Sequence, residues 1–309
     1  MSNFVGEIAA LSAAGLWAVA SVLYGRVGEV IPPLLLNLFK GIIAIAFLIL
    51  TIFLVGDSLP SLPLLSLTLI LLSGVIGIGV GDTIFFAAIN SLGARRTLLL
   101  GTLAPPLTAI FGLLFLDEQL QIQAWWGIFL TIIGVAWVIT ERTTDQLLRG
   151  YSQLLRGTAW GLLAAITNSI GAILSRAAFK MTTASPLWVA LLRLSAGEVT
   201  LILLITVFSR GKSFADFRKF TNLKIVIATI VAAFCGTYLG IWLQQTAIKL
   251  TPTGIAQTLL QTSPIFILPL AVFTGEKISG RAIAGVLVAI AGIALLFYLN
   301  QPPNVIPYT

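Results

Sequence analysis

Four charged side chains fall inside apolar stretches that are long enough to span a membrane: Lys40, Asp82, Arg193 and Glu198. A charge is costly to bury in a membrane, so such residues are candidates for a functional site. The two cations are suited to hold an anionic group such as a carboxylate. The two acids are suited to proton coupling, because burial favours the neutral form of a carboxyl group. We therefore predict substrate binding at Lys40 and Arg193 and proton coupling at Asp82 or Glu198.

Each of these residues also has a structural interpretation. Lys40 and Arg193 lie about two turns from a helix end, within snorkelling reach of the membrane interface. Asp82 is suited to pair with a cation such as Lys40, in a stretch where three glycines allow close backbone approach. Glu198 follows Arg193 by five residues, which permits an intrahelical pair of imperfect geometry. The sequence leaves both interpretations open.

Amide side chains form a second set of candidates. Gln257 and Gln261 are four residues apart and so share one helix face. Amides suit a water-filled cavity for a small polar or zwitterionic solute, or alternatively hydrogen bonds between helices. Trp17 and Tyr238 lie among small residues, where they would contact a solute or act as gates. The predicted substrate-binding amides are Asn168, Gln244, Gln245, Gln257 and Gln261.

The composition places these residues in an all-α integral membrane protein. Only 9% of the 309 residues are charged and 58% are hydrophobic, whereas a soluble domain carries roughly 25% charged residues. Topology explains the net charge of +7 better than nucleic-acid binding does. The chain has no histidine, one cysteine and no GxxxxGK[ST] motif. We therefore expect no metal, no cofactor, no ATP-driven step and no enzyme activity.

Ten apolar runs are long enough to be membrane-spanning helices. A polar connection at residues 141–154 separates a first repeat, 1–140, from a second repeat, 155–300, which a short tail, 301–309, follows. The predicted spans are Phe4–Tyr24, Pro33–Val55, Leu64–Ile89, Thr97–Leu116, Ile122–Thr140, Leu155–Phe179, Pro186–Phe208, Leu223–Ile248, Gly254–Thr274 and Arg281–Leu299.

The two halves repeat each other. Lys40 and Arg193 each follow a helix-opening proline, Pro33 or Pro186, by seven residues. If each half crosses the membrane five times, the second enters from the opposite side and the repeats are inverted, which is a physical basis for alternating access. The stretches 97–134 and 255–292 share five landmarks. These are Pro106 and Pro264, Phe115 and Phe273, Glu118 and Glu276, Gly127 and Gly285, and Gly134 and Gly292.

Lysine and arginine in the connections predict the orientation. One alternate set of loops holds most of the basic residues, including Arg95 and Arg96, and should therefore be cytoplasmic. The other set holds only Arg176, Lys180 and Lys249. Both termini then lie on the non-cytoplasmic side of the cytoplasmic (inner) membrane, which is the periplasmic side in a Gram-negative cell.

The doubled pattern resembles the EamA-type permeases of the drug/metabolite transporter superfamily. The resemblance rests in each half on a proline in the fourth helix, an acidic hinge at Glu118 or Glu276, and a glycine-spaced fifth helix. Asp117 stands where the family pattern prefers glycine. The resemblance implies a secondary transporter with a central cavity between the halves.

From this resemblance we expect a permease, an exporter, for small polar metabolites such as amino-acid-like or drug-like solutes. An alternative is a carrier of sugar phosphates, nucleotide sugars or organic acids that uses Lys40 and Arg193, and a channel is less favoured. The expected partners are a small-molecule substrate and the lipid bilayer, without nucleic acid. The spaced glycines suit helix packing or a homodimer seam.

Overall fold

The computed structural model describes residues 4–115, 124–139, 151–208, 222–250, 256, 259–273 and 279–299, and within these ranges every regular element is a helix. Gln257, Glu118 and Glu276 lie outside the described residues. Within the described residues, six helices are long and apolar enough to cross a membrane, and shorter apolar helices cover Trp125–Val138 and Gly280–Leu295. The six are Val5–Gly28, Pro33–Val55, Leu64–Leu92, Ser152–Phe179, Pro186–Val207 and Leu223–Leu250.

Proline and glycine set the ends of the first helices. Pro33 opens α2, where its missing N–H costs nothing. Gly56 ends α2 and Gly93 ends α4, both with positive φ, of 70° and 82°, which glycine adopts without steric cost. Between Gly56 and Gly93 one continuous helix changes from α to π geometry and back. The elements are α1 (Val5–Gly28), α2 (Pro33–Val55), α3 (Leu64–Gly74), η1 (Val75–Asp82) and α4 (Thr83–Leu92).

The predicted span Thr97–Leu116 is divided into two helices, α5 (Ala94–Gly101) and α6 (Ala104–Phe115). The division falls at Thr102 and Leu103, whose amides donate to carbonyls three residues back. Pro105 and Pro106 cause it, because neither can supply the amide hydrogen that a continuous helix needs here. The first half ends with α7 (Ala124–Ile139).

The second half follows the same plan. Ser185 precedes α10, and its hydroxyl accepts from the Trp188 amide at 3.3 Å as an N-cap. The continuous helix of residues 223–250 also contains a π-helical segment. Pro264 lies in the first turn of α15, as Pro106 does in α6. The elements are α9 (Tyr151–Phe179), α10 (Pro186–Phe208), α12 (Leu223–Ala232), η3 (Ala233–Leu239), α13 (Gly240–Leu250), α15 (Ser263–Phe273) and α16 (Gly280–Leu299).

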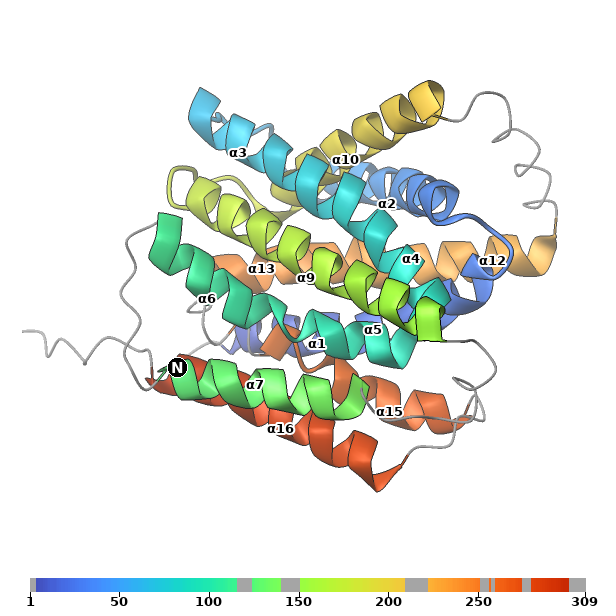
Figure 1. Ribbon diagram of the computed structural model, residues 1–309. Coiled ribbons are helices and arrows are strands. Elements are labelled where there is room, and N and C mark those ends of the chain that lie inside the picture. Colours follow the sequence, from blue (N-terminus) through green and yellow to red (C-terminus); the bar gives the residue numbers. More distant parts are fainter. Residues whose placement is uncertain are drawn as a thin grey trace, which may run out of the picture.

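The final helices of the two halves, α7 and α16, pack side by side and antiparallel (Figure 1). A Cβ atom on Gly134 would lie 2.7 Å from the Gly285 oxygen, and one on Gly292 would lie 2.8 Å from the Gly127 oxygen. Since Gly134 corresponds to Gly292 and Gly127 to Gly285, the two contacts are the same contact seen from either half. Such reciprocity is what a two-fold relation produces.

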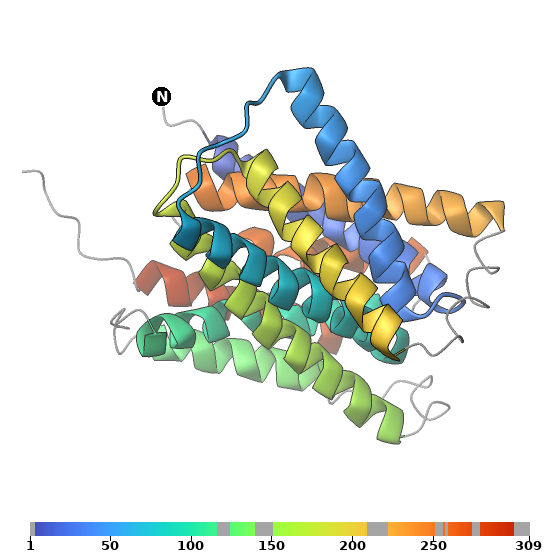
Figure 2. The same cartoon turned by 90° about the horizontal axis from the view of Figure 1, so that it is seen from above.

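The second helices of the halves also run in opposite directions. The hydroxyl of Ser185, at the start of α10, donates to the carboxylate of Asp57, just after the end of α2. The two helices pack against each other on the side of the molecule away from α7 and α16, and α1, α9 and α13 lie between these pairs (Figures 1 and 2). The amide side chains of Asn168 on α9 and Gln244 on α13 therefore lie between these outer pairs of helices.

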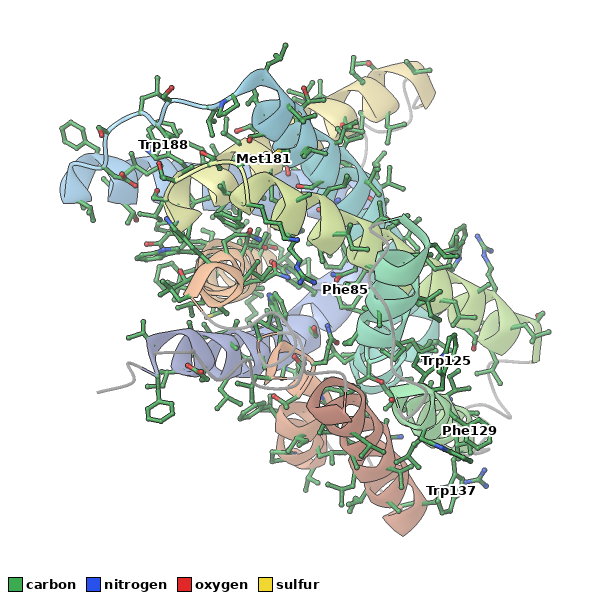
Figure 3. All side chains as sticks on the ribbon, turned by 90° about the vertical axis from the view of Figure 1, so that its left-hand side faces the viewer. Phe85, Trp125, Phe129, Trp137, Met181 and Trp188 are labelled. Carbon is green, nitrogen blue, oxygen red and sulfur yellow. The ribbon has the colours of Figure 1, made fainter. Side chains whose placement is uncertain are left out.

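The outer surface is apolar. Trp125, Phe129 and Trp137 are exposed on α7 and point outward, whereas Phe85 lies in the interior between the helices (Figure 3). Exposed tryptophans near a helix end suit the interface between lipid and water. The exposed leucine, isoleucine and phenylalanine side chains of α2, α3 and α10 suit contact with lipid.

Candidate functional site

A cavity of about 150 Å³ lies at the centre of the helix bundle, and residues of both halves line it. This volume accommodates roughly ten water-sized groups, which is the size of a small metabolite. The lining combines charged, amide and hydroxyl groups with apolar surface from Phe85 and Phe86. Of the predicted site residues, the cavity brings together Trp17, Lys40, Asp82, Asn168, Arg193, Gln244 and Gln261.

Lys40 and Asp82 form an ion pair at the cavity wall. The Nζ atom of Lys40 lies 2.5 Å from the Asp82 Oδ2 atom, and the side chains are 3% and 30% exposed. The ring of Phe86 lies 5.4 Å from the same Nζ atom, which is within range for a cation–π interaction. Lys40 therefore does not snorkel to the membrane interface; its cation stays inside the bundle, beside a carboxylate that faces the cavity.

Arg193 also stays inside the bundle but has a different environment. Its side chain is 6% exposed, and among the described residues neither Nε nor Nη1 has a hydrogen-bond partner. Its Nη2 atom lies over Gly77 and Gly171, where a Cβ would come within 3.5 and 3.6 Å of it. A buried guanidinium with unused donors has the geometry to bind a carboxylate.

The two π-helical segments occupy equivalent places in the repeats. Pro264 follows Pro106 by 158 residues, and Ala233, the first residue of η3, follows Val75, the first of η1, by the same 158. A π segment frees carbonyl groups from the regular ladder, and such segments are frequent at functional sites. Both segments line the cavity, through Asp82 in one and Gly236 and Thr237 in the other.

Side chains from other helices satisfy these freed carbonyls at equivalent positions. Asn37 on α2 donates to the Ile78 oxygen at 2.9 Å, and Trp17 on α1 donates to the Gly236 oxygen at 3.0 Å. Gly236 is the position 158 residues after Ile78. Asn37 also donates to the Thr83 hydroxyl at 2.9 Å. Trp17 thus has a structural bond and faces the cavity as well.

Glu198 lies behind the cavity wall rather than in it. Its side chain packs against Gly41, where the missing Cβ leaves the room that the carboxyl group occupies. The residue is 4% exposed, and neither carboxyl oxygen has a hydrogen-bond partner among the described residues. No salt bridge to Arg193 forms within the described part of the chain, so the intrahelical pair considered from the sequence is absent there.

The structure places Tyr238 and Gln245 outside the cavity. The Tyr238 hydroxyl lies 2.6 Å from that of Thr51, and its ring packs against Phe47 and Phe234. Gln245 is fully buried, and both polar atoms of its amide lack partners in the described structure. Helical register explains both placements. Thr237 and Gln244 face the cavity, so Tyr238 and Gln245, which follow them directly in the sequence, face other helices.

Several residues that line the cavity, on α1, η3, α5 and α15, were not predicted from the sequence. Tyr24 and Thr237 join the two halves, because their hydroxyl oxygens lie 2.9 Å apart. A signal was present: Trp17, Ser21 and Tyr24 are spaced four and three apart, which puts them on one helix face. The missed hydroxyl residues of the lining are Ser21, Tyr24, Thr97, Thr237 and Ser263.

The two polar residues that flank Asn168 in the sequence serve helix packing. Thr167 bonds the carbonyl oxygens of its own helix at 3.0 Å. Ser169 donates to the Ala104 oxygen of α6 at 2.9 Å. Asn168, between them, lines the cavity. Within the described residues no group of three or more cysteine, aspartate or glutamate side chains is arranged to hold a metal ion.

Comparisons with known proteins agree with the duplicated architecture. The chain matches the EamA-like transporter family twice, over residues 4–140 and over residues 155–298. No curated protein matches it significantly. A solved structure described only as "Crystal structure of protein" is similar in fold, with a TM-score of 0.68 and 17% identity over 95% of this chain and 96% of that chain.

The family match covers nearly the whole chain in two repeats, and the family is one of transporters rather than enzymes. Apolar helices of spanning length in both halves agree with a protein that crosses the membrane several times. The chain therefore belongs to the EamA-like transporter family and is a multi-pass membrane transporter.

Proposed function

We propose that this transporter carries small zwitterionic metabolites of amino-acid size, and that Arg193 binds their carboxylate. The observation that carries the proposal is the buried guanidinium of Arg193, whose Nε and Nη1 donors have no partner in the described structure although the residue lines the cavity. A solute carboxylate supplies the missing acceptors. Asn168, Gln244 and Gln261 then bind the neutral polar groups of the solute.

Repeat symmetry supports Arg193 as the anion site. In the first half Lys40 pairs with Asp82. The position 158 residues after Asp82 is Gly240, so the second half has no carboxylate where the first half has one. Trp17 occupies that space, because a Cβ on Gly240 would lie 2.5 Å from its Nε1 atom. The solute carboxylate thus serves as the counter-ion that the second half lacks.

The charge balance favours a zwitterion over a polyanion. Lys40 and Arg193 contribute two positive charges, and Asp82 and Glu198 contribute up to two negative charges. Lys40 is already paired, so at most one cation remains for the solute. A phosphorylated solute would bring a second negative charge without a partner, which is costly in a low-dielectric cavity. Sugar phosphates and nucleotide sugars are therefore the second choice.

We further propose ten spans in two inverted repeats, residues 1–140 and 155–300, joined by 141–154. The antiparallel packing of α7 with α16 and of α2 with α10 supports inversion. The bias of basic residues toward one set of loops supports a cytoplasmic membrane with both termini on the outer side. Export is the proposed direction, on resemblance to the family alone.

Reconstitution into liposomes tests the substrate class. Liposomes that contain the purified protein are preloaded with an unlabelled mixture of amino acids. Exchange is then measured for labelled amino acids, neutral sugars, dicarboxylates and sugar phosphates. We expect exchange of amino acids above that of empty liposomes, and none of sugar phosphates. Exchange of sugar phosphates alone would replace this proposal with the anionic alternative. Equal passage of all solutes without saturation would indicate a channel.

A further inference from the structure

The carboxyl group of Glu198 is isolated from hydrogen-bond partners within the described structure, at the margin of the cavity. It is buried against Gly41 of α2, and neither oxygen has a partner in the described structure. Burying a lone carboxylate is far more costly than burying a neutral acid. In the solute-free arrangement Glu198 therefore holds a proton. A buried polar group without a partner calls for an explanation in function or strain.

Few charges surround this acid. α10 packs against α2, α3, η1 and α13, of which α3 carries no titratable side chain. Lys249 on α13 lies at the helix end, where it donates to the Ala184 oxygen at 2.9 Å. Lys40 and Asp82 are the charged groups of these elements that act electrostatically on Glu198. The titratable groups on these elements are Lys40 on α2, Asp82 on η1, Lys249 on α13 and Arg193 on α10 itself.

Lys40 is close to both acids. Its ammonium contacts Asp82, while Gly41, the next residue, contacts Glu198. Asp82 is the more accessible acid, since its side chain is 30% exposed and lines the cavity. A solute ammonium that binds Asp82 competes with Lys40 for the carboxylate. Because Lys40 is almost fully buried, losing its partner would be strongly destabilising unless a second acceptor is within reach.

We infer that Lys40 alternates between Asp82 in the empty site and Glu198 when a solute ammonium occupies Asp82. The hydrogen bond from Lys40 to Asp82 breaks, and one from Lys40 to Glu198 forms. Glu198 gives up its proton, which passes to solvent, as it gains the ammonium, so each solute bound releases one proton. The inference rests on the proposed function, because it assigns proton coupling to Glu198 within that same cavity.

Infrared spectroscopy of the solute-free protein in lipid tests the exchange without a known substrate. A protonated carboxyl group has a C=O stretching band that a carboxylate lacks. We expect a band at neutral pH that Glu198→Gln removes and that the control Glu29→Gln, at an exposed site, leaves in place. Asp82→Asn mimics occupation of Asp82, so Lys40 should turn to Glu198 and the band should disappear. Asp82→Asn combined with Lys40→Met should restore it.

Retention of the band in Asp82→Asn would overturn the inference, as would a wild-type spectrum without any band sensitive to Glu198→Gln. Folding is a second readout. If Asp82→Asn folds only when Lys40 is also replaced, Glu198 does not accept the ammonium and the inference fails. Failure of the proposed function would appear differently, as liposomes that exchange no amino acid while the infrared band behaves as expected.

Discussion

Lys40 and Arg193 occupy equivalent positions in the two halves, yet within the described structure only Lys40 forms a salt bridge, with Asp82 at 2.5 Å. Both cations line one cavity, so the duplicated chain encloses an asymmetric charge arrangement. A perfectly symmetric site would bind two like groups. Because Gly240 replaces the carboxylate of Asp82, the Nε and Nη1 donors of Arg193 have no partner among the described residues, whereas Lys40 is in an ion pair. This asymmetry suits a solute with unlike ends.

Replacing Arg193 should abolish recognition of the solute carboxylate. We expect Arg193→Met to lower exchange of amino acids in liposomes by about 10- to 100-fold, because hydrogen bonds to a charged group contribute roughly 1.5–3 kcal/mol. Arg193→Lys should recover only part of the loss, since an ammonium lacks the bidentate fork. Arg26→Met, at an exposed site in the last turn of α1, is the matched control. Equal activity of Arg193→Met and the control would show that Arg193 does not bind the solute.

Gln244 and Gln245 should respond in opposite ways. Gln244→Leu removes a polar group of the cavity and should weaken exchange. Gln245→Leu replaces a buried amide without partners in the described structure, so it should raise the melting temperature and leave exchange unchanged. The expected gain in the free energy of unfolding is about 1–3 kcal/mol. Thermal unfolding in detergent and liposome exchange measure the two effects. A destabilised Gln245→Leu would show that the amide has a partner in the protein.

The seam between α7 and α16 should not tolerate side chains at its glycines. A Cβ on Gly134 would lie 2.5 Å from the Ala289 nitrogen, and backbone atoms cannot move aside as side chains do. We expect Gly134→Val to lower the free energy of unfolding by about 1–3 kcal/mol or more. Gly280→Ala is the control, because nothing lies within 4 Å of a Cβ there. Unfolding curves that coincide for the two variants would contradict antiparallel packing in this register.

The indole of Trp17 should stabilise the second π segment through its N–H group. Trp17→Phe keeps the aromatic ring but leaves the Gly236 oxygen without its donor at 3.0 Å. We expect a loss of about 1 kcal/mol, within the range for hydrogen bonds between membrane helices. Exchange should fall as well, because Trp17 and Gly236 both line the cavity. Trp126→Phe is the matched control, because it makes the same replacement on the exposed face of α7.

Topology tests the count of spans. Tags at Met1 and Thr309 should be accessible from the same side of the membrane, because ten spans return the chain to its starting side. From the positive charges of the loops we expect that side to be outside the cytoplasm. Labelling of intact cells and of inverted vesicles distinguishes the two sides. Tags on opposite sides would require an odd number of spans.

Much of the architecture is local and could therefore be predicted. Long apolar runs, helix-opening prolines such as Pro33, and the doubled glycines Gly134 and Gly292 identify membrane helices and a repeat from sequence alone. The break between α5 and α6 also follows from Pro105 and Pro106, although Thr97–Leu116 is a single span in the prediction from sequence. Equivalence of Lys40 and Arg193 is visible for the same reason, since it depends only on spacing along the chain.

The partners of these cations depend on the tertiary structure. Asp82 is 42 residues from Lys40, and Glu198 reaches Gly41 from the other half of the chain. Spacing shows that a residue is on a helix but not which neighbour its face meets, and a π segment shifts that face by part of a turn. Thus Gln244 and Thr237 face the cavity while Gln245 and Tyr238 do not. The sequence determines which groups are available, and the packing of two antiparallel halves decides which of them meet.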